Sequence, residues 1–91
     1  MTALLDKYEA LTTEALALAK KAPAKDKNAA HEILDMASRY ASDAKHFRSK
    51  GDIERALAAF SYAHGWLDCG ARLGIFTVDD DRLFTVDPKK K

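Results

Sequence analysis

The chain has 91 residues, of which 47% are hydrophobic, and 15 Lys and Arg against 14 Asp and Glu give a net charge of +1. This length supports one small domain and argues against a sheet-based enzyme fold with a deep pocket. The balanced charge argues against a dedicated nucleic-acid binder, which carries a clear basic surplus. Alanine supplies 17 residues, whereas Val, Ile and Thr supply only ten, five of them in the last 17 positions. The first three quarters are therefore predicted to be helical.

The first predicted element is an amphipathic helix over about residues 2–22. Its apolar side chains recur every three or four residues, which keeps them on one face of a helix. Thr2 is the expected N-terminal cap, and Pro23 ends the helix because proline has no backbone N–H to continue it.

The second predicted helix covers about residues 27–50 and has the same apolar spacing. Asp26 or Asn28 is the expected cap, and Gly51 is the residue expected in the left-handed conformation that ends a helix. Asp52 then caps the next helix at once. So short a connection predicts that the two helices are antiparallel neighbours.

The third predicted helix covers about residues 53–73 and carries two apolar stripes. The first stripe consists of Ile53, Ala56, Phe60, Ala63, Leu67 and Gly70. The second stripe, rotated from it by about a third of a turn or more, consists of Ala59, Tyr62, Trp66, Cys69 and Leu73. A helix that is apolar around most of its circumference is normally buried on several sides. Two partner helices are therefore expected to cover the two stripes, which gives an all-α, up-and-down three-helix bundle over residues 1–74.

Residues 75–91 form a C-terminal tail of different character. The motif Phe-Thr-Val-Asp occurs at 76–79 and again at 84–87, which predicts short extended segments or a hairpin with its turn at residues 79–81. A lone two-stranded hairpin is marginal in water, so the tail packs either on its own bundle or on another chain. Residues 88–91 are expected to be disordered.

The polar edge of the third helix is the main candidate for chemistry. His64, Asp68 and Arg72 are four residues apart and stack along one edge. Asp68 could orient His64 as a general base, but we favour a half-buried histidine satisfied by that carboxylate, beside a surface ion pair. His31, His46 and His64 come from different segments without metal-ligand spacing. We therefore expect no catalytic residue, metal site or cofactor.

Two glycines lie inside this helix, where each costs about 1 kcal/mol relative to alanine. Gly70 lies on the first stripe, where close helix contact explains it. Gly65 lies on the polar face and could admit the tail, a partner chain or a ligand. Tyr62 and Trp66 form an aromatic stripe that the two tail phenylalanines could cover, although such residues also dominate binding surfaces.

These segments resemble an archaeal family called domain of unknown function 357. The resemblance is carried by Tyr40-Ala-Ser-Asp43-Ala44, Phe47, Lys50-Gly51-Asp52, Ser61-Tyr-Ala-His-Gly-Trp-Leu-Asp68, Gly70, Arg72-Leu73-Gly74 and Phe76. It covers residues 30–76 well and the first helix weakly, and Cys69 stands where the family has alanine. The resemblance implies an up-and-down three-helix bundle and no known activity.

A weaker similarity links Gly51-Asp52 and Tyr62-Ala63 to the helical nucleotide-binding domains found beside minimal nucleotidyltransferases and in some RNases. The RNase members carry an arginine a few residues before a histidine. Arg55 lies nine residues before His64, so this departure argues against nuclease chemistry.

These observations predict a small cytoplasmic, non-catalytic helical module that works by protein contact, with a homodimer through the third helix or the tail as one form. Its single cysteine, Cys69, excludes an internal disulfide, and the sequence has neither a secretory signal nor a membrane-length apolar run. The alternative is a nucleotide- or RNA-binding domain that uses the edge of His64, Asp68 and Arg72, and a hydrolase comes third. The candidate binding residues are Tyr62, His64, Gly65, Trp66, Asp68 and Arg72.

Overall fold

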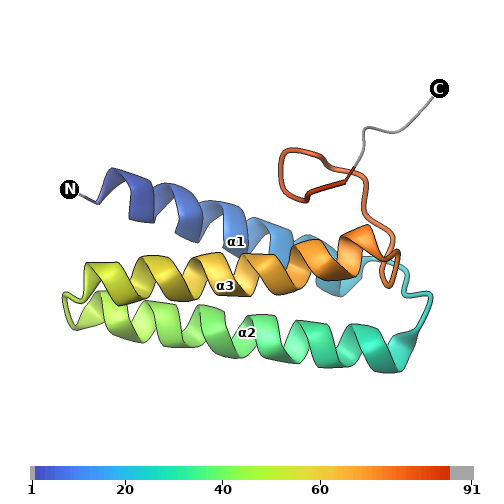
Figure 1. Cartoon of the computed structure of the whole chain (residues 1–91), viewed down its shortest axis with the longest axis horizontal. Coiled ribbons are helices and arrows are strands. Elements are labelled where there is room, and N and C mark those ends of the chain that lie inside the picture. The colour runs from blue at the N-terminus through green and yellow to red at the C-terminus, as the bar shows by residue number, and fades with distance from the viewer. Residues whose placement is uncertain (1, 87–91) are drawn as a thin grey trace.

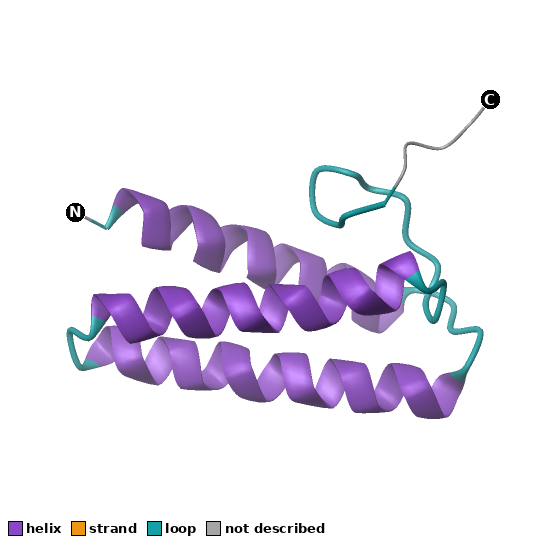
Figure 2. Ribbon diagram, in the orientation of Figure 1, coloured by secondary structure: helices purple, strands orange, loops and turns teal. Residues whose placement is uncertain are grey.

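The structure is a computed structural model that describes residues 2–86. It contains three helices in up-and-down order: α1 (Ala3–Lys21), α2 (Lys27–Ser49) and α3 (Ile53–Arg72). α3 lies between α1 and α2 (Figure 1), and no strand forms within residues 2–86 (Figure 2). The all-α prediction is confirmed. The disorder expected for residues 88–91 lies outside the described residues.

Two of the three predicted caps are present. The Asp26 carboxylate accepts a hydrogen bond from the Ala29 backbone N–H at 3.0 Å, and Asp52 accepts one from the Arg55 N–H at 3.1 Å. Thr2 occupies the N-cap position of α1, and its carbonyl oxygen accepts a hydrogen bond from the Asp6 N–H at 2.8 Å, but its side chain makes no capping hydrogen bond. Its backbone (φ −103°, ψ 6°) lies outside the extended region that capping residues usually adopt.

Both helix-ending glycines adopt the left-handed conformation that favours glycine. Gly51 has φ 78° and follows α2, while Gly74 has φ 69° and follows α3. The short connection at Gly51 turns the chain straight into α3, so α2 and α3 are antiparallel neighbours as predicted.

Alanine lines most of the bundle core and lets the helices approach closely. The half near the α2–α3 connection also holds large side chains of the bundle itself, Leu5 and Phe60. In the other half the bundle contributes mainly alanines and Leu67, and the tail adds the large side chains Phe76, Leu83 and Phe84, which are 1–2% exposed. The tail therefore completes the core of its own bundle.

Within residues 75–86 the tail forms no hairpin with itself. Phe76 instead forms an isolated antiparallel bridge with Ala24, in the connection between α1 and α2. The chain then turns at Asp80, whose carbonyl accepts hydrogen bonds from the N–H groups of Leu83 and Phe84. The two Phe-Thr-Val segments stay unpaired with each other, because the first uses its backbone on the helix connection and the second follows a turn into the core.

Candidate functional site

Both ring nitrogens of His64 are hydrogen-bonded, to two different segments of the chain. Nε2 donates to the carbonyl oxygen of Leu83 in the tail, and Nδ1 lies 3.1 Å from the hydroxyl oxygen of Thr12 in α1. A carbonyl only accepts, so Nε2 carries a proton. The Thr12 hydroxyl also donates to the carbonyl oxygen of Phe60 at 3.5 Å. Thr12 is fully buried. His64 therefore joins α1, α3 and the tail.

Two further side chains hold the same stretch of the tail. The Asp68 carboxylate accepts a hydrogen bond from the Thr85 backbone N–H at 2.7 Å. Arg82 forms a bidentate ion pair with Glu14 of α1, at 2.8 and 3.3 Å. Hydrogen bonding to Glu14 raises the pKa of Arg82. We call the contacts that Glu14, His64 and Asp68 make with residues 82–85 the tail clasp.

The hydrogen bonds of the tail clasp explain the presence of His64 and Asp68 without a catalytic role for either residue. A general base needs a free lone pair that faces the substrate, and both nitrogens of His64 are already engaged. The sequence predicted that the Asp68 carboxylate would be the hydrogen-bond partner of His64. The Asp68 oxygen instead lies 4.0 Å from Nε2, and the partners of the histidine are Thr12 and Leu83. Arg72 is exposed at the end of α3.

The two helical glycines have different surroundings. Gly70 packs against Phe76 of the tail and Ile33 of α2, so the expected helix contact is present, with the tail as the closer neighbour. Nothing would meet a side chain at Gly65 within 4 Å. Residues 75–86 of the tail therefore do not pack on Gly65, so this glycine does not admit the described part of the tail.

The second stripe of α3 stays largely uncovered, contrary to the expectation that partner helices bury both stripes. Tyr62 is 53% exposed and Leu73 is 68% exposed. Cys69 is also exposed and Trp66 is half-buried, so only Ala59 of this stripe is buried. Because Phe76 packs at Gly70 on the first stripe, the tail phenylalanines do not cover Tyr62. The rotation between the stripes explains this, since the bundle buries the first stripe, whereas the second stripe meets only Tyr40 of α2 at its edge.

A groove between α2 and α3 continues this apolar surface. Its volume is about 480 Å³, and its lining consists of Tyr40, Asp43, Phe47, Arg55, Ala58, Ala59 and Tyr62. The rings of Tyr40 and Tyr62 meet edge to face with their centres 4.4 Å apart, and the ring centre of Trp66 lies 6.3 Å from that of Tyr62. The Arg55 guanidinium lies 6.0 Å from the centre of the Phe47 ring.

Sequence reasoning missed most of the residues that line this groove. Tyr40 and Phe47 follow the apolar spacing of the second predicted helix, which does not distinguish a core position from the wall of a groove. Arg55 did give a signal, because at about 100° per residue it falls on the same side of α3 as Ala58 and Tyr62. A charged residue on an apolar arc marks a place where that arc meets solvent.

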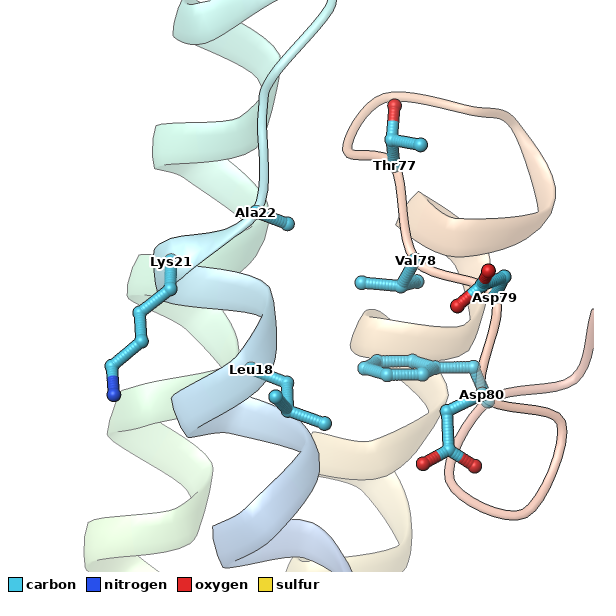
Figure 3. A pocket seen from close by; sticks show the side chains of 8 residues that line it. Leu18, Lys21, Ala22, Thr77, Val78, Asp79 and Asp80 are labelled. Atoms are coloured by element: carbon cyan, nitrogen blue, oxygen red, sulfur yellow. The ribbon is translucent and has the colours of Figure 1, made fainter.

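A second pocket, of about 280 Å³, lies between the end of α1 and the tail. Figure 3 shows that Leu18 and Ala22 face Val78 across it, while the Lys21 side chain points away from Asp80. The side chains that face each other are thus apolar, and the Lys21 ammonium and the Asp80 carboxylate do not point toward each other.

The described residues offer neither a metal cluster nor a membrane-spanning helix. Within residues 2–86, no three side chains of the metal-ligating types His, Cys, Asp and Glu cluster together. None of the described helices combines the length and the apolar character that crossing a membrane requires.

Comparison with known proteins places the chain in a family. No curated protein and no solved structure matches it significantly. A family model described as a protein of unknown function, DUF357, matches residues 7–76. The match runs through most of α1 and all of α2 and α3, and it ends at Phe76, before the clasped residues 82–85. The chain therefore belongs to the DUF357 family, as the motif at residues 61–68 predicted.

Proposed function

We propose that this protein is a non-catalytic interaction module that binds another protein chain through the second stripe of α3 and the adjoining α2–α3 groove. The observation that carries the proposal is the exposure of large apolar side chains along this stripe, Tyr62 at 53% and Leu73 at 68%. Leu4 and Leu18, which are also exposed, lie apart from it on α1. Small soluble domains seldom leave a connected apolar surface open unless it meets a partner.

The composition of this surface also supports protein contact. Tyrosine, tryptophan and arginine are the residues that most often dominate the energy of protein interfaces, and Tyr62, Trp66 and Arg55 occur together here. The rigid rings of Tyr40 and Tyr62 already pack against each other, so binding orders few side chains. Cys69 is an exposed thiol on the same surface, which suits a reducing compartment such as the cytoplasm.

The alternative, a nucleotide- or RNA-binding edge at His64, Asp68 and Arg72, has less support. Two of its three groups hold the tail through Leu83 and Thr85. A ligand at this edge would first have to displace the clasp.

Site-directed photo-crosslinking in cells tests the proposal. p-Benzoylphenylalanine replaces Tyr62, an aromatic substitution at an exposed position. The matched control carries the same probe at Ser61, which is exposed on the polar side of α3. We expect a protein adduct from position 62 and none from position 61. An absence of adducts from position 62, or the same adducts from both positions, would contradict the proposal.

A further inference from the structure

We propose that the occupant of the α2–α3 groove is a second copy of this chain, related to the first by a two-fold axis that runs along the groove. This inference rests on the proposed function, because it names the partner of that surface. The lining residues come from α2 and α3 only, so α1 and the tail leave the groove open to a partner along both walls.

The charges of the groove favour this symmetry. Asp43 on the α2 wall is exposed and has no ion pair or hydrogen bond within residues 2–86. Arg55 on the α3 wall is 73% exposed and pairs only with Asp52, three residues before it, at 3.5 Å. A two-fold axis parallel to the helices sets the α2 wall of one copy on the α3 wall of the other. Asp43 then lies on the wall opposite the partner's Arg55 and about one helical turn along from it, a distance that the long arginine side chain can span, and symmetry repeats the pair.

Other orientations lose this complementarity. A two-fold axis perpendicular to the helices sets the α2 wall against the α2 wall of the partner, which brings the acids to face each other. Like charges across an interface oppose association. The position of one acid and one base on opposite walls therefore selects the axis along the groove.

The shapes of the two walls agree with the same axis. The α2 wall presents the large rings of Tyr40 and Phe47, whereas the α3 wall presents the small side chains of Ala58 and Ala59 beside Tyr62. Setting α2 on α3 of the other copy places large rings over small side chains from both directions. The two α2–α3 pairs then form a four-helix bundle, which covers the exposed ring of Tyr62.

Sedimentation equilibrium of the full chain tests the inference. We expect the wild type to sediment at twice its chain mass. Asp43→Arg sets two arginines against each other at both symmetric positions, and Arg55→Glu sets two acids against each other. We expect each variant alone to weaken self-association by about tenfold or more.

An equimolar mixture of Asp43→Arg and Arg55→Glu is the decisive sample. In the mixed dimer, the arginine introduced at position 43 of one copy faces the glutamate introduced at position 55 of the other. The second pair keeps the native Arg55 and Asp43, so both pairs are attractive and association returns. Lys45→Glu and Glu54→Arg make the same kinds of charge change at exposed positions outside the groove, and we expect both to dimerise like the wild type. Circular dichroism of each variant checks that it is folded.

Three results would overturn the inference: a wild-type chain that stays monomeric at roughly 1 mM, folded single variants that dimerise normally, or a mixture that fails to associate. Its failure is distinguishable from that of the proposed function. A monomeric chain whose probe at position 62 captures a different protein refutes the second copy and retains the interaction module. A monomeric chain with no adduct at that position refutes both.

Discussion

Phe76 occupies the space that a side chain at Gly70 would need. A Cβ built on Gly70 would lie 2.4 Å from Cε2 of Phe76 and 3.3 Å from Cδ1 of Ile33. Ordinary carbon contacts are about 3.5–4.0 Å, so the ring and the glycine fit only in the absence of that atom. Because Phe76 is 1% exposed, it has little room to retreat.

We therefore predict that Gly70→Ala destabilises the protein by about 1–3 kcal/mol through overpacking. The matched control is Gly65→Ala in the same helix, because a Cβ added at Gly65 would meet nothing within 4 Å. Removing this helical glycine should stabilise the protein by about 0.5–1 kcal/mol. Urea denaturation measures both effects. If the two variants shift stability equally, Phe76 does not constrain Gly70.

His64→Ala should destabilise the folded state, because it removes the side-chain donor to the Leu83 carbonyl and the closer of the two partners of the buried Thr12 hydroxyl, which keeps only the Phe60 carbonyl at 3.5 Å. Each buried polar group left without a partner costs about 1–3 kcal/mol. His31→Ala, at an exposed position of α2, is the control and should have almost no effect. Hydrogen exchange at the Thr85 amide provides a local readout, since loosening of the clasp should speed it. Unchanged exchange there would mean that the clasp does not depend on His64.

The tail contributes to stability through burial, so truncating its core side chains should be costly. Phe84 is 2% exposed, and Phe84→Ala is expected to cost about 3–5 kcal/mol, as is usual for such core deletions. Leu73 is 68% exposed, and Leu73→Ala should change the stability of the isolated chain by less than about 0.5 kcal/mol. Thermal denaturation in dilute solution compares them. Similar melting temperatures for the two variants would argue against the tail as part of the core.

Arg48 links the far end of α2 to the start of α1, through ion pairs with Asp6 and, at 2.6 Å, with Glu9. The hydrogen bonds to Asp6 and then Glu9 raise the pKa of Arg48. A raised pKa means that the contribution of the charged guanidinium is complete at neutral pH and is lost as strong alkali deprotonates it.

Salt is therefore the more useful variable for testing this link. Arg48→Gln should lower the melting temperature in low salt, and the difference from the wild type should shrink in roughly 1 M NaCl, because ions screen exposed pairs. Lys45→Gln, which removes an exposed charge from the same helix, should show a smaller effect at both salt concentrations. A difference that is independent of salt would assign the role of Arg48 to packing.

The helices could be predicted from the sequence because their signals are local. Apolar spacing, the caps Asp26 and Asp52, and the glycines at 51 and 74 each act within a few residues. Thr2 shows the limit of such reasoning, since a suitable side chain caps only when its backbone adopts the required conformation.

The path of the tail could not be predicted, because it depends on contacts between distant residues. The repeated Phe-Thr-Val segments indicate extended structure, but not that Phe76 pairs with Ala24. The edge of His64, Asp68 and Arg72 was predicted from spacing within α3 alone, and such spacing does not indicate what the side chains bind. Spacing on α3 brought His64 and Asp68 together, but Leu83 and Thr85, which they hold, come from outside the helix.

The tail clasp also sets an order on events during synthesis. α2 and α3 are adjacent in sequence and can pair as they leave the ribosome. The ion pair between Glu14 and Arg82 can form only after Arg82, which follows Glu14 by 68 residues, has been synthesised. Late long-range contacts of this kind slow folding, because a large loop must close before they form. Although α1 is made before α2 and α3, it should therefore be the last of the three to settle into place, and a chaperone that protects nascent chains would find the unpaired face of α1 exposed for most of that time.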